Sequence, residues 1–330
     1  MVNQLTEEIR RVIGEALPDP EAAARPELAE YARMLRDYPE RGGKMLRGQL
    51  VVLTARAYGD DSVALPVAAA IELFQNWVLI HDDIEDDSEE RRGRPALHRA
   101  YPMPLALNAG DALHAVMWRL LVEAGARRKV MAEFTQLIET TASGQHLDLT
   151  WALENRFDLT PEDYFEMVER KAAYYTGVAP LRLGALAAGK LPHPVFSTAG
   201  LELGVAFQII DDVLNLEGER EAYGKEIAGD LWEGKRTLIL IDYLSQAPTG
   251  ERARAEEILR LPRQQKNPED VAWLHRRIVE SGAVARARRL AEEKAAAALT
   301  ELEAVFAGLP GREAAAETLG LLRKLVDRQS

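Results

Sequence analysis

The chain has 330 residues and a formal net charge of −12, from 53 acidic and 41 basic side chains. This acidity argues against binding nucleic acid, which requires Lys and Arg to neutralise many phosphates. The sequence contains no cysteine, which excludes disulfides and thiolate metal sites and fits a cytoplasmic protein. The length permits two ordinary domains or one large one.

No targeting or membrane-spanning segment is evident in the sequence. Residues 1–11 lack the basic stretch followed by an apolar stretch that marks a signal peptide. A membrane-spanning helix needs about 18 or more apolar residues. The closest approach, over 67–80, is interrupted by Glu72, Gln75 and Asn76. We therefore expect a soluble, cytoplasmic protein without a membrane span.

Helix signals dominate from the start of the chain. An amphipathic helix is expected over 3–17, because the pattern ends before Pro18. Two more helices are expected over 27–37 and 46–58. Residues 63–87 form a longer segment with apolar residues on nearly every side, which is typical of a helix at the centre of a bundle.

The rest of the chain continues this pattern. Residues 91–104 and 218–234 carry glycine, proline or polar residues and are expected to be loops. Further helices are expected over 106–124, 128–150, 161–187, 196–217, 235–246, 251–260, 268–281, 283–307 and 312–328. No stretch shows the sustained alternation of a strand. The sequence therefore predicts an all-α fold, with one large helical bundle over 1–330 around a central cavity.

An aspartate-rich motif, Asp82-Asp83-x-x-Asp86, ends the expected central helix. Asp82 and Asp86 are four residues apart, so a helix places them on one face, where like charges repel. Such a pair is suited to hold Mg²⁺, which prefers oxygen ligands. Arg91 and Arg92 follow, and guanidinium groups match phosphate oxygens. The alternative is a solvated acidic helix end that forms salt bridges with the two arginines.

A second motif of the same form, Asp211-Asp212, ends the apolar helix over 196–217. Bundle proteins build metal sites from side chains on facing helices, so two such helix ends favour a shared metal cleft. Basic residues occur in three further segments: Lys44 and Arg47 after Gly42-Gly43, Lys171 in an Ala- and Tyr-rich helix, and Lys225 and Lys235 in a glycine-containing loop. Each of these, taken alone, could equally be a solvated surface side chain.

The ordered set of motifs resembles the all-trans isoprenyl diphosphate synthases, also called polyprenyl synthetases. The resemblance runs from Gly42 to Thr237, and six motifs in the expected order make it highly specific. The matching segments are Gly42-Gly43-Lys44-x-x-Arg47, Asp82-Asp83-x-x-Asp86 with Arg91-Arg92-Gly93, Asn108-Ala109-Gly110-Asp111, Gly144-Gln145-x-x-Asp148, Phe207-Gln208-x-x-Asp211-Asp212, and Gly224-Lys225 through Lys235-x-Thr237.

This resemblance implies the isoprenoid synthase type of bundle and a Mg²⁺-dependent prenyltransferase. Such an enzyme condenses isopentenyl diphosphate head to tail with an allylic diphosphate and releases diphosphate. Asp82, Asp86 and Asp211 would hold three Mg²⁺ ions that also grip the allylic diphosphate. Asp83 and Asp212 would assist at the metal site, partly through metal-bound water.

The resemblance also distributes the basic and polar residues between two substrates. The allylic diphosphate would be held by Arg91, Lys171, Lys225 and Lys235, and isopentenyl diphosphate by Lys44, Arg47, Gln75 and Arg92. Gln208 would face the allylic cation together with the backbone carbonyl near Lys171. A homodimer formed through helices next to the active site is implied as well.

Two positions depart from the family pattern. Asn215 stands where many relatives have a third aspartate, and an amide offers an oxygen without charge. We expect a weaker or water-mediated metal contact there. Ala172 stands where Thr is usual, which removes one hydroxyl from the surroundings of the cation.

Product length depends, in this family, on residues just before the first aspartate pair. Phe74 and Trp77 occupy those positions, an arrangement that resembles archaeal-type short-chain enzymes, so we expect geranylgeranyl diphosphate (C20). The size of Trp leaves farnesyl diphosphate (C15) as the alternative. Helix geometry alone places Val78 nearer the face of Asp82, and ordinary core packing is the alternative for both aromatic residues.

Two other classes of protein remain to be weighed. A terpene cyclase or head-to-head condensing enzyme of the same fold does not need the second diphosphate site implied by Lys44 and Arg47. A non-catalytic partner subunit would not need to retain Asp82, Lys171 and Asp211. Both alternatives are therefore less favoured than a synthase.

Overall fold

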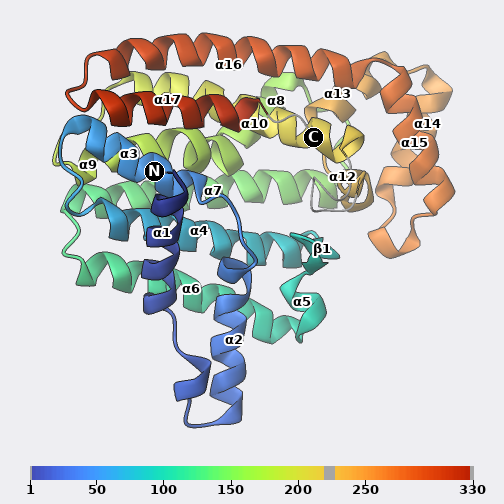
Figure 1. Cartoon of the computed structure of the whole chain (residues 1–330). Helices are drawn as coiled ribbons and strands as arrows, with labels where there is room; N and C mark the ends of the chain where they lie inside the picture. Colours follow the sequence, from blue (N-terminus) through green and yellow to red (C-terminus); the bar gives the residue numbers. More distant parts are fainter. Residues whose placement is uncertain (1, 219–226, 328–330) are drawn as a thin grey trace. The chain divides into compact units, whose positions relative to one another are not determined.

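The structure is a computed structural model and describes residues 2–218 and 227–327. Over these residues the chain is almost entirely helical, which confirms the all-α prediction (Figure 1). The strands in this part are β1 (Glu90–Arg91) and β2 (Arg94–Pro95), which pair antiparallel.

The longer helices are α1 (Val2–Ala16), α2 (Pro26–Glu40), α3 (Leu46–Tyr58), α4 (Ala64–Glu85), α6 (Met103–Glu123), α7 (Arg128–Leu153), α8 (Pro161–Val168), α9 (Ala179–Ala187), α10 (Val195–Glu217), α13 (Leu238–Gln246), α14 (Thr249–Arg260), α15 (Pro268–Glu280), α16 (Ala283–Ala307) and α17 (Arg312–Val326). The shorter ones are α5 (Leu97–Ala100), α12 (Gly229–Glu233), and the 3₁₀ turns η1 (Pro20–Ala22) and η3 (Arg263–Gln265). A π-helix, η2 (Glu169–Val178), joins α8 to α9.

The chain divides into two compact units. The first comprises Met1–Gln136, Ala179–Ser197 and Leu302–Leu322. The second comprises Leu137–Val178, Thr198–Glu301 and Arg323–Ser330. The first aspartate motif belongs to the first unit, and the second motif belongs to the second unit.

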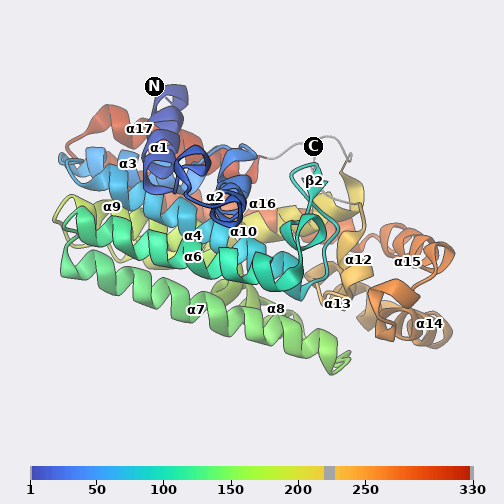
Figure 2. The same cartoon turned by 90° about the horizontal axis from the view of Figure 1, so that it is seen from below.

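Helix α4 is the central element of the first unit. It packs on α6, α3 and α1, and Figure 2 shows it running beside α6. Its residues from Val67 to Phe74 are all buried, as the apolar pattern predicts. Among the described residues, α4 is also the one helix long and apolar enough to cross a membrane, contrary to the expectation that none reaches this threshold. In its most apolar window, 61% is buried inside the protein, as for a core helix.

Residues 91–104 were expected to be a loop, but the structure forms a β-hairpin and a short helix there. Strands β1 and β2 form a hairpin whose two turn residues, Arg92 and Gly93, both have positive φ, 54° and 70°. Two-residue hairpin turns of this type favour glycine at such a position. The hairpin fixes where Arg91 and Arg92 leave the backbone, and α5 follows it directly.

The expected helix over 27–37 is longer in the structure. Helix α2 continues through Pro39 to Glu40, which keeps Tyr38 in its last turn. Similarly, α12 lies inside the segment 218–234 that was expected to be a loop, and α13 begins at Leu238 rather than at residue 235.

The expected helix over 161–187 is interrupted in the structure. Thr160 starts α8 with a capping box to Asp163. The backbone then widens into η2, and π-helical segments occur frequently at functional sites. Lys171, which was expected to hold the allylic diphosphate, lies within this π-helix and not in a regular α-helix.

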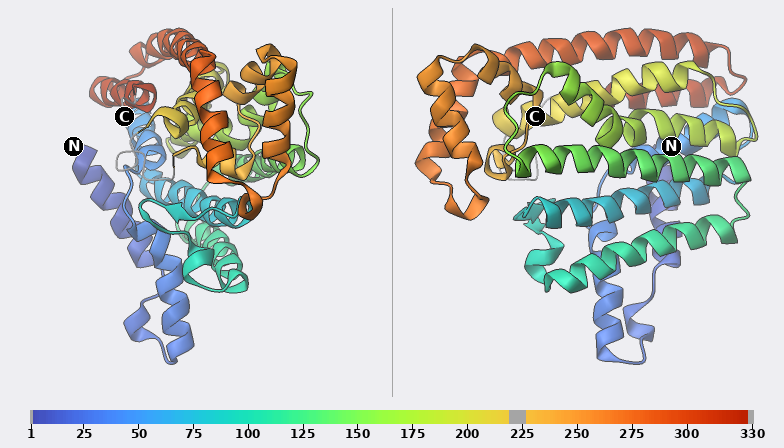
Figure 3. Two further views of the ribbon diagram at one scale, coloured as in Figure 1. Left: turned by 90° about the vertical axis from the view of Figure 1, so that its right-hand side faces the viewer. Right: turned by 180° about the vertical axis from the view of Figure 1, so that it is seen from behind.

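Glycines allow η2 to approach its neighbours closely. A Cβ on Gly144 of α7 would lie 2.2 Å from the backbone nitrogen of Lys171. A Cβ on Gly177 would lie 2.0 Å from the carbonyl oxygen of Gly200, and one on Gly204 2.5 Å from Ala173. The backbone of η2 therefore contacts α7 and α10 through positions that accept no side chain. Figure 3 shows these long helices from two further sides.

Replacing Gly144 with Ala tests this packing. We expect Gly144→Ala to lower the free energy of unfolding by about 1–3 kcal/mol, because the added methyl group overlaps backbone atoms that cannot rotate away. Urea unfolding measures the effect. Gly14→Ala is the matched control, because a Cβ there has nothing within 4 Å and alanine favours the helix by about 1 kcal/mol. Equal stability of Gly144→Ala and wild type would contradict the close approach.

Candidate active site

Asp83 is completely buried and is held by two partners from other segments. Arg91 donates through Nε to both carboxylate oxygens at 3.0 Å, and through Nη2 to Oδ1. The Tyr38 hydroxyl donates to Oδ2 at 2.5 Å and accepts from the backbone N–H of Leu97 at 3.1 Å. Burial, followed by the charge of Asp83, raises the pKa of Tyr38 above its usual range. Asp83 therefore has protein donors on both oxygens.

Asp82 and Asp86 differ from Asp83 in their surroundings. Both are partly exposed at the end of α4, one turn apart. Arg91 Nη2 lies 3.4 Å from Asp82 Oδ2, so the guanidinium joins the two neighbouring aspartates. Two carboxylates that keep contact with solvent on one helix face are suited to bind a divalent cation. Asp83 is suited instead to hold the end of α4 in place, because both of its oxygens already accept hydrogen bonds. Within residues 2–218 and 227–327, no three His, Cys, Asp or Glu side chains converge as a complete metal site.

Arg47 and Arg92 gather around a buried carboxylate that the sequence did not reveal. Glu72 accepts the backbone N–H of Gly48 at 2.8 Å. Burial raises the pKa of Glu72, while the Gly48 N–H and then the charges of Arg47 and Arg92 oppose the rise. The structure thus brings together two of the four residues expected at the isopentenyl diphosphate site.

The glycine pair before Lys44 explains how Arg92 is placed. Arg92 Nη1 donates to the carbonyls of Tyr38 at 3.0 Å and Gly42 at 2.6 Å. Gly43 has a φ of 122°, and a Cβ there would lie 3.4 Å from the guanidinium carbon of Arg92. Lys44 follows in the same loop and is exposed. Gln75, also expected at this site, is partly exposed on α4, three residues after Glu72.

The second aspartate pair repeats the division seen in the first. Asp212 is buried, accepts the Tyr164 hydroxyl at 2.7 Å on Oδ2, and accepts Gln208 Nε2 at 2.8 Å on Oδ1. Burial raises the pKa of Asp212 to about 7. Asp211 remains partly exposed. In both pairs the second aspartate is bonded by a buried tyrosine and the first keeps access to solvent.

Lys171 is the cation of the π-helix η2. Its Nζ donates to Asp148 Oδ2, and Asp148 belongs to the Gly144-Gln145-x-x-Asp148 segment of α7. This segment therefore supplies both the glycine that lets Lys171 approach and the carboxylate that orients its amine. Ala172, next to it, is buried.

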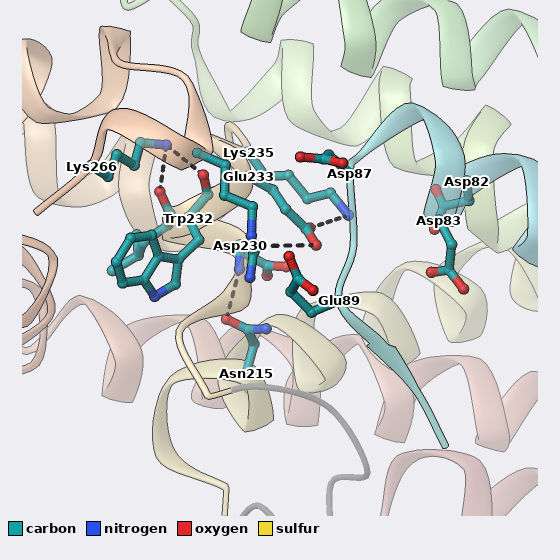
Figure 4. Close-up of polar contacts among 12 residues, drawn as sticks. Asp82, Asp83, Asp87, Glu89, Asn215, Asp230, Trp232, Glu233, Lys235 and Lys266 are labelled. Atoms are coloured by element: carbon teal, nitrogen blue, oxygen red, sulfur yellow. Dashed lines mark hydrogen bonds and ion pairs between the residues drawn. The ribbon is translucent and has the colours of Figure 1, made fainter. Parts of the chain in front are cut away.

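Lys235 and Asn215 lie at the segment that carries α12. Lys235 Nζ is 3.1 Å from Glu233 Oε2 (Figure 4). Asn215 is buried, and its side-chain oxygen accepts the backbone N–H of Asp230 at 3.3 Å. The amide at this position thus anchors α12. Lys225, expected to bind the allylic diphosphate, lies outside the described residues.

The aromatic residues before the first motif are part of a longer stack. Phe74 meets Trp77 edge to face at 5.7 Å, and Trp77 stacks on His114 of α6 with ring centres 4.1 Å apart. His114 Nε2 accepts the indole N–H of Trp118 at 2.8 Å. Because that nitrogen accepts, His114 is neutral, in agreement with burial lowering its pKa.

His81 packs against α6. Its Nε2 lies 3.4 Å from the carbonyl of Leu107, and a Cβ on Gly110 would come within 2.4 Å of it. Gly110 in the Asn108-Ala109-Gly110-Asp111 segment therefore lets α6 approach α4 closely at His81, the residue before the first aspartate pair.

Comparison with known proteins shows the family. The polyprenyl synthetase model matches residues 29–278. The short chain isoprenyl diphosphate synthase of Methanothermobacter thermautotrophicus is 37% identical over 224 residues, which are 66% of this chain and 68% of that protein. The geranylfarnesyl diphosphate synthase of Natronomonas pharaonis is 35% identical over 257 residues, 71% and 74% of the two chains.

A solved structure resembles the whole chain. The geranylgeranyl pyrophosphate synthase from Corynebacterium glutamicum, complexed with isoprenyl diphosphate and magnesium, has a TM-score of 0.87, 25% identity, and coverage of 100% of both chains. The fold is therefore the isoprenoid synthase helical fold, and the protein is of the prenyltransferase class. The chain belongs to the polyprenyl synthetase family.

Tyr38 tests the anchoring of Asp83. We expect Tyr38→Phe to lower the free energy of unfolding by about 1–3 kcal/mol, because the buried Leu97 N–H loses its acceptor and Asp83 loses a donor. Chemical denaturation measures the change. Tyr31→Phe is the control on the same helix, and we expect it to be nearly neutral, because no hydrogen bond of that hydroxyl is found among the described residues. An equally small effect at Tyr38 would count against the anchor.

Proposed function

We propose that this protein is a short-chain isoprenyl diphosphate synthase that makes geranylgeranyl diphosphate. It condenses isopentenyl diphosphate head to tail with allylic diphosphates and releases diphosphate. The observation that carries the proposal is the shared construction of the two aspartate pairs. Asp83 and Asp212 are bonded by buried tyrosines, whereas Asp82 and Asp211 keep access to solvent.

Asp82, Asp86 and Asp211 are the proposed ligands of the metal, with Asp83 and Asp212 assisting behind them. Their oxygen donors suit Mg²⁺, and three ions are proposed by analogy with the family. When bound, the metal neutralises charge that develops on the departing diphosphate. The related structure from Corynebacterium glutamicum is described as complexed with magnesium, which supports divalent metal use.

Cationic side chains complete the proposed substrate sites. Arg91, Lys171, Lys225 and Lys235 are proposed to hold the allylic diphosphate, and Lys44, Arg47, Gln75 and Arg92 to hold isopentenyl diphosphate. The position of Arg47 and Arg92 supports the second assignment, because the charges of both arginines act on the same buried carboxylate, Glu72. A terpene cyclase does not need this second site.

The proposed reaction starts with cleavage of the allylic C–O bond, which leaves both electrons on diphosphate. Cations fixed where this charge develops lower the barrier without reorganising. The double bond of isopentenyl diphosphate then attacks the allylic cation, and the resulting intermediate loses a proton, proposed to pass to diphosphate. Gln208 is proposed to face the cation. Its amide donates to Asp212, which leaves its oxygen to orient toward positive charge.

The Trp77 stack supports a short product. The indole of Trp77 packs between Phe74 on its own helix and His114 on α6. Trp118 holds His114 by a hydrogen bond, so the Trp77 side chain has little freedom to change rotamer. We propose that this stack stops elongation at C20. Farnesyl diphosphate remains the alternative, while the Natronomonas pharaonis relative is named for the longer geranylfarnesyl product.

The chain is further proposed to act as one catalytic domain, as a homodimer in the cytoplasm. Four limits of the two compact units fall inside α7, α10, α16 and α17, and the fifth falls where η2 passes directly into α9. A surface on α6 supports self-association, because Met103, Leu107 and Val122 are apolar and exposed.

The function is tested with purified protein, Mg²⁺, isopentenyl diphosphate and geranyl or farnesyl diphosphate. We expect release of diphosphate that requires both substrates, and a loss of at least about 100-fold in kcat for Asp82→Ala, since it removes a metal ligand. Glu85→Ala, on the same helical turn and exposed, is the control and should stay near wild type. No turnover in wild type, or near-normal turnover in Asp82→Ala, would overturn the assignment.

Product length is tested at Trp77. We expect Trp77→Ala to shift the main product from C20 to longer chains, because removing the indole opens space beside His114. Trp273→Ala on α15 is the matched control and should leave the distribution unchanged. Chromatography of the dephosphorylated products measures both. Unchanged lengths in Trp77→Ala would show that another residue limits the product.

A further inference from the structure

Helix α12 ends two residues before Lys235, and this short helix is not stable in isolation. It has only five residues, and isolated helices below about 12 residues are marginal in water. Its N-terminal neighbour, Ala228, has a left-handed φ of 58°. The geometry of Lys235 therefore depends on contacts that α12 makes with other elements.

Asn215 at the end of α10 holds the first end of α12. Its side-chain oxygen accepts the backbone N–H of Asp230 at 3.3 Å, and its carbonyl accepts the N–H of Ala228 at 2.7 Å. These two bonds satisfy backbone donors that a helix start leaves without partners. Figure 4 shows the Asn215 amide pointing at Asp230.

Lys266 holds the other end of α12. Its Nζ donates to the carbonyls of Leu231 at 2.9 Å and Trp232 at 2.6 Å (Figure 4). A cation at a helix C-terminus complements the helix dipole and the unbonded carbonyls found there. Lys266 is only 7% exposed, and burial lowers its pKa to about 8. It stands between η3 and α15, where the adjacent Asn267 caps α15.

Arg236 fixes the backbone next to Lys235. Its Nη1 donates to the carbonyl of Gly234, and its Nε donates to the carbonyl of Arg156 at 2.7 Å. Its guanidinium carbon lies 4.3 Å from the ring centre of Phe157. The side chain is 2% exposed, and burial lowers its pKa to about 10.

Lys266 and Arg236 are buried cations that contact carbonyl groups instead of carboxylates, which is unfavourable for the stability of the fold. Removing a charged group from water is costly unless its partners compensate fully. Apolar side chains of similar size would fill the same space at lower cost. What the cations provide instead is direction, because each one fixes carbonyls of residues that directly precede Lys235 in the chain.

We propose that Lys266 and Arg236 are positioning residues that set Lys235 for the allylic diphosphate, and that the α14–α15 hairpin serves to deliver Lys266. The hairpin packs on α12 through α15 and is visible in orange in Figure 3. This inference rests on the proposed function of Lys235. It adds that a hairpin without any proposed substrate ligand controls affinity for one of the two substrates.

The test compares Lys266→Met and Lys266→Gln with Lys266→Arg, which keeps a charged donor. We expect the first two to raise KM for the allylic diphosphate by roughly tenfold or more, the size seen when a residue supporting a ligand is lost. KM for isopentenyl diphosphate should stay within about twofold of wild type, and Lys266→Arg should recover most of the loss. A purely structural role would lower the active fraction without separating the two KM values.

Arg254→Gln is the matched control on the same hairpin. Its guanidinium stacks on Trp273 and pairs with Asp270, contacts that stay within α14 and α15, so both KM values should match wild type. Arg236→Lys keeps the charge but cannot donate to the carbonyls of Gly234 and Arg156 at the same time. We expect it to raise KM for the allylic diphosphate as Lys266→Met does. Equal KM values for the allylic substrate in wild type and Lys266→Gln would overturn the proposal.

A binding measurement separates this inference from the proposed function. Calorimetric titration of inorganic diphosphate with Mg²⁺ requires no turnover, so it reports on Lys235 even if wild type elongates no chain. We expect binding to weaken by about tenfold in Lys266→Gln and to be unchanged in Arg254→Gln. Unchanged binding in Lys266→Gln overturns the positioning role. Absence of turnover in a wild type that binds diphosphate overturns only the proposed function.

Discussion

The structure depends on how two adjacent carboxylates at the end of an apolar helix avoid repelling each other. In both aspartate pairs the second member turns into the protein and is bonded by a tyrosine hydroxyl, Tyr38 for Asp83 and Tyr164 for Asp212. A buried carboxylate is tolerated only when its oxygens are hydrogen-bonded. Once one carboxylate is fixed in this way, its neighbour is held near the surface with its charge available.

The hairpin after α4 follows from this arrangement. Arg91 must reach Asp83, so the chain after α4 turns back in a tight hairpin with positive φ at Arg92 and Gly93. The same hairpin aims Arg92 at the Gly42 carbonyl, beside the loop of Lys44. The proposed metal ligand Asp82 and the proposed diphosphate-binding arginines are thus positioned by one local geometry.

Much of this could be predicted from the sequence. The helical pattern, the aspartate pairs and the basic motifs carry strong local signals, because charge and glycine stand out against apolar helices. Tyr38, Tyr164 and Glu72 could not be found, since a single polar residue in a helix has no periodic signature and its partner is far along the chain. The sequence predicts an α-helix around Lys171 where the structure has a π-helix, because the residue pattern carries no signal that separates the two. His114 and Lys266 act through tertiary contacts that the sequence does not reveal.

We propose that the first aspartate of each pair binds metal and that the second anchors it. Calorimetric binding of Mg²⁺ and inorganic diphosphate, with thermal unfolding of the metal-free protein, tests it most directly in Asp82→Asn and Asp83→Asn. We expect Asp82→Asn to lose metal and diphosphate binding and to keep its thermal stability. We expect Asp83→Asn to lose stability, while its folded fraction still binds. An Asp83→Asn protein that is as stable as wild type but binds no metal would contradict it.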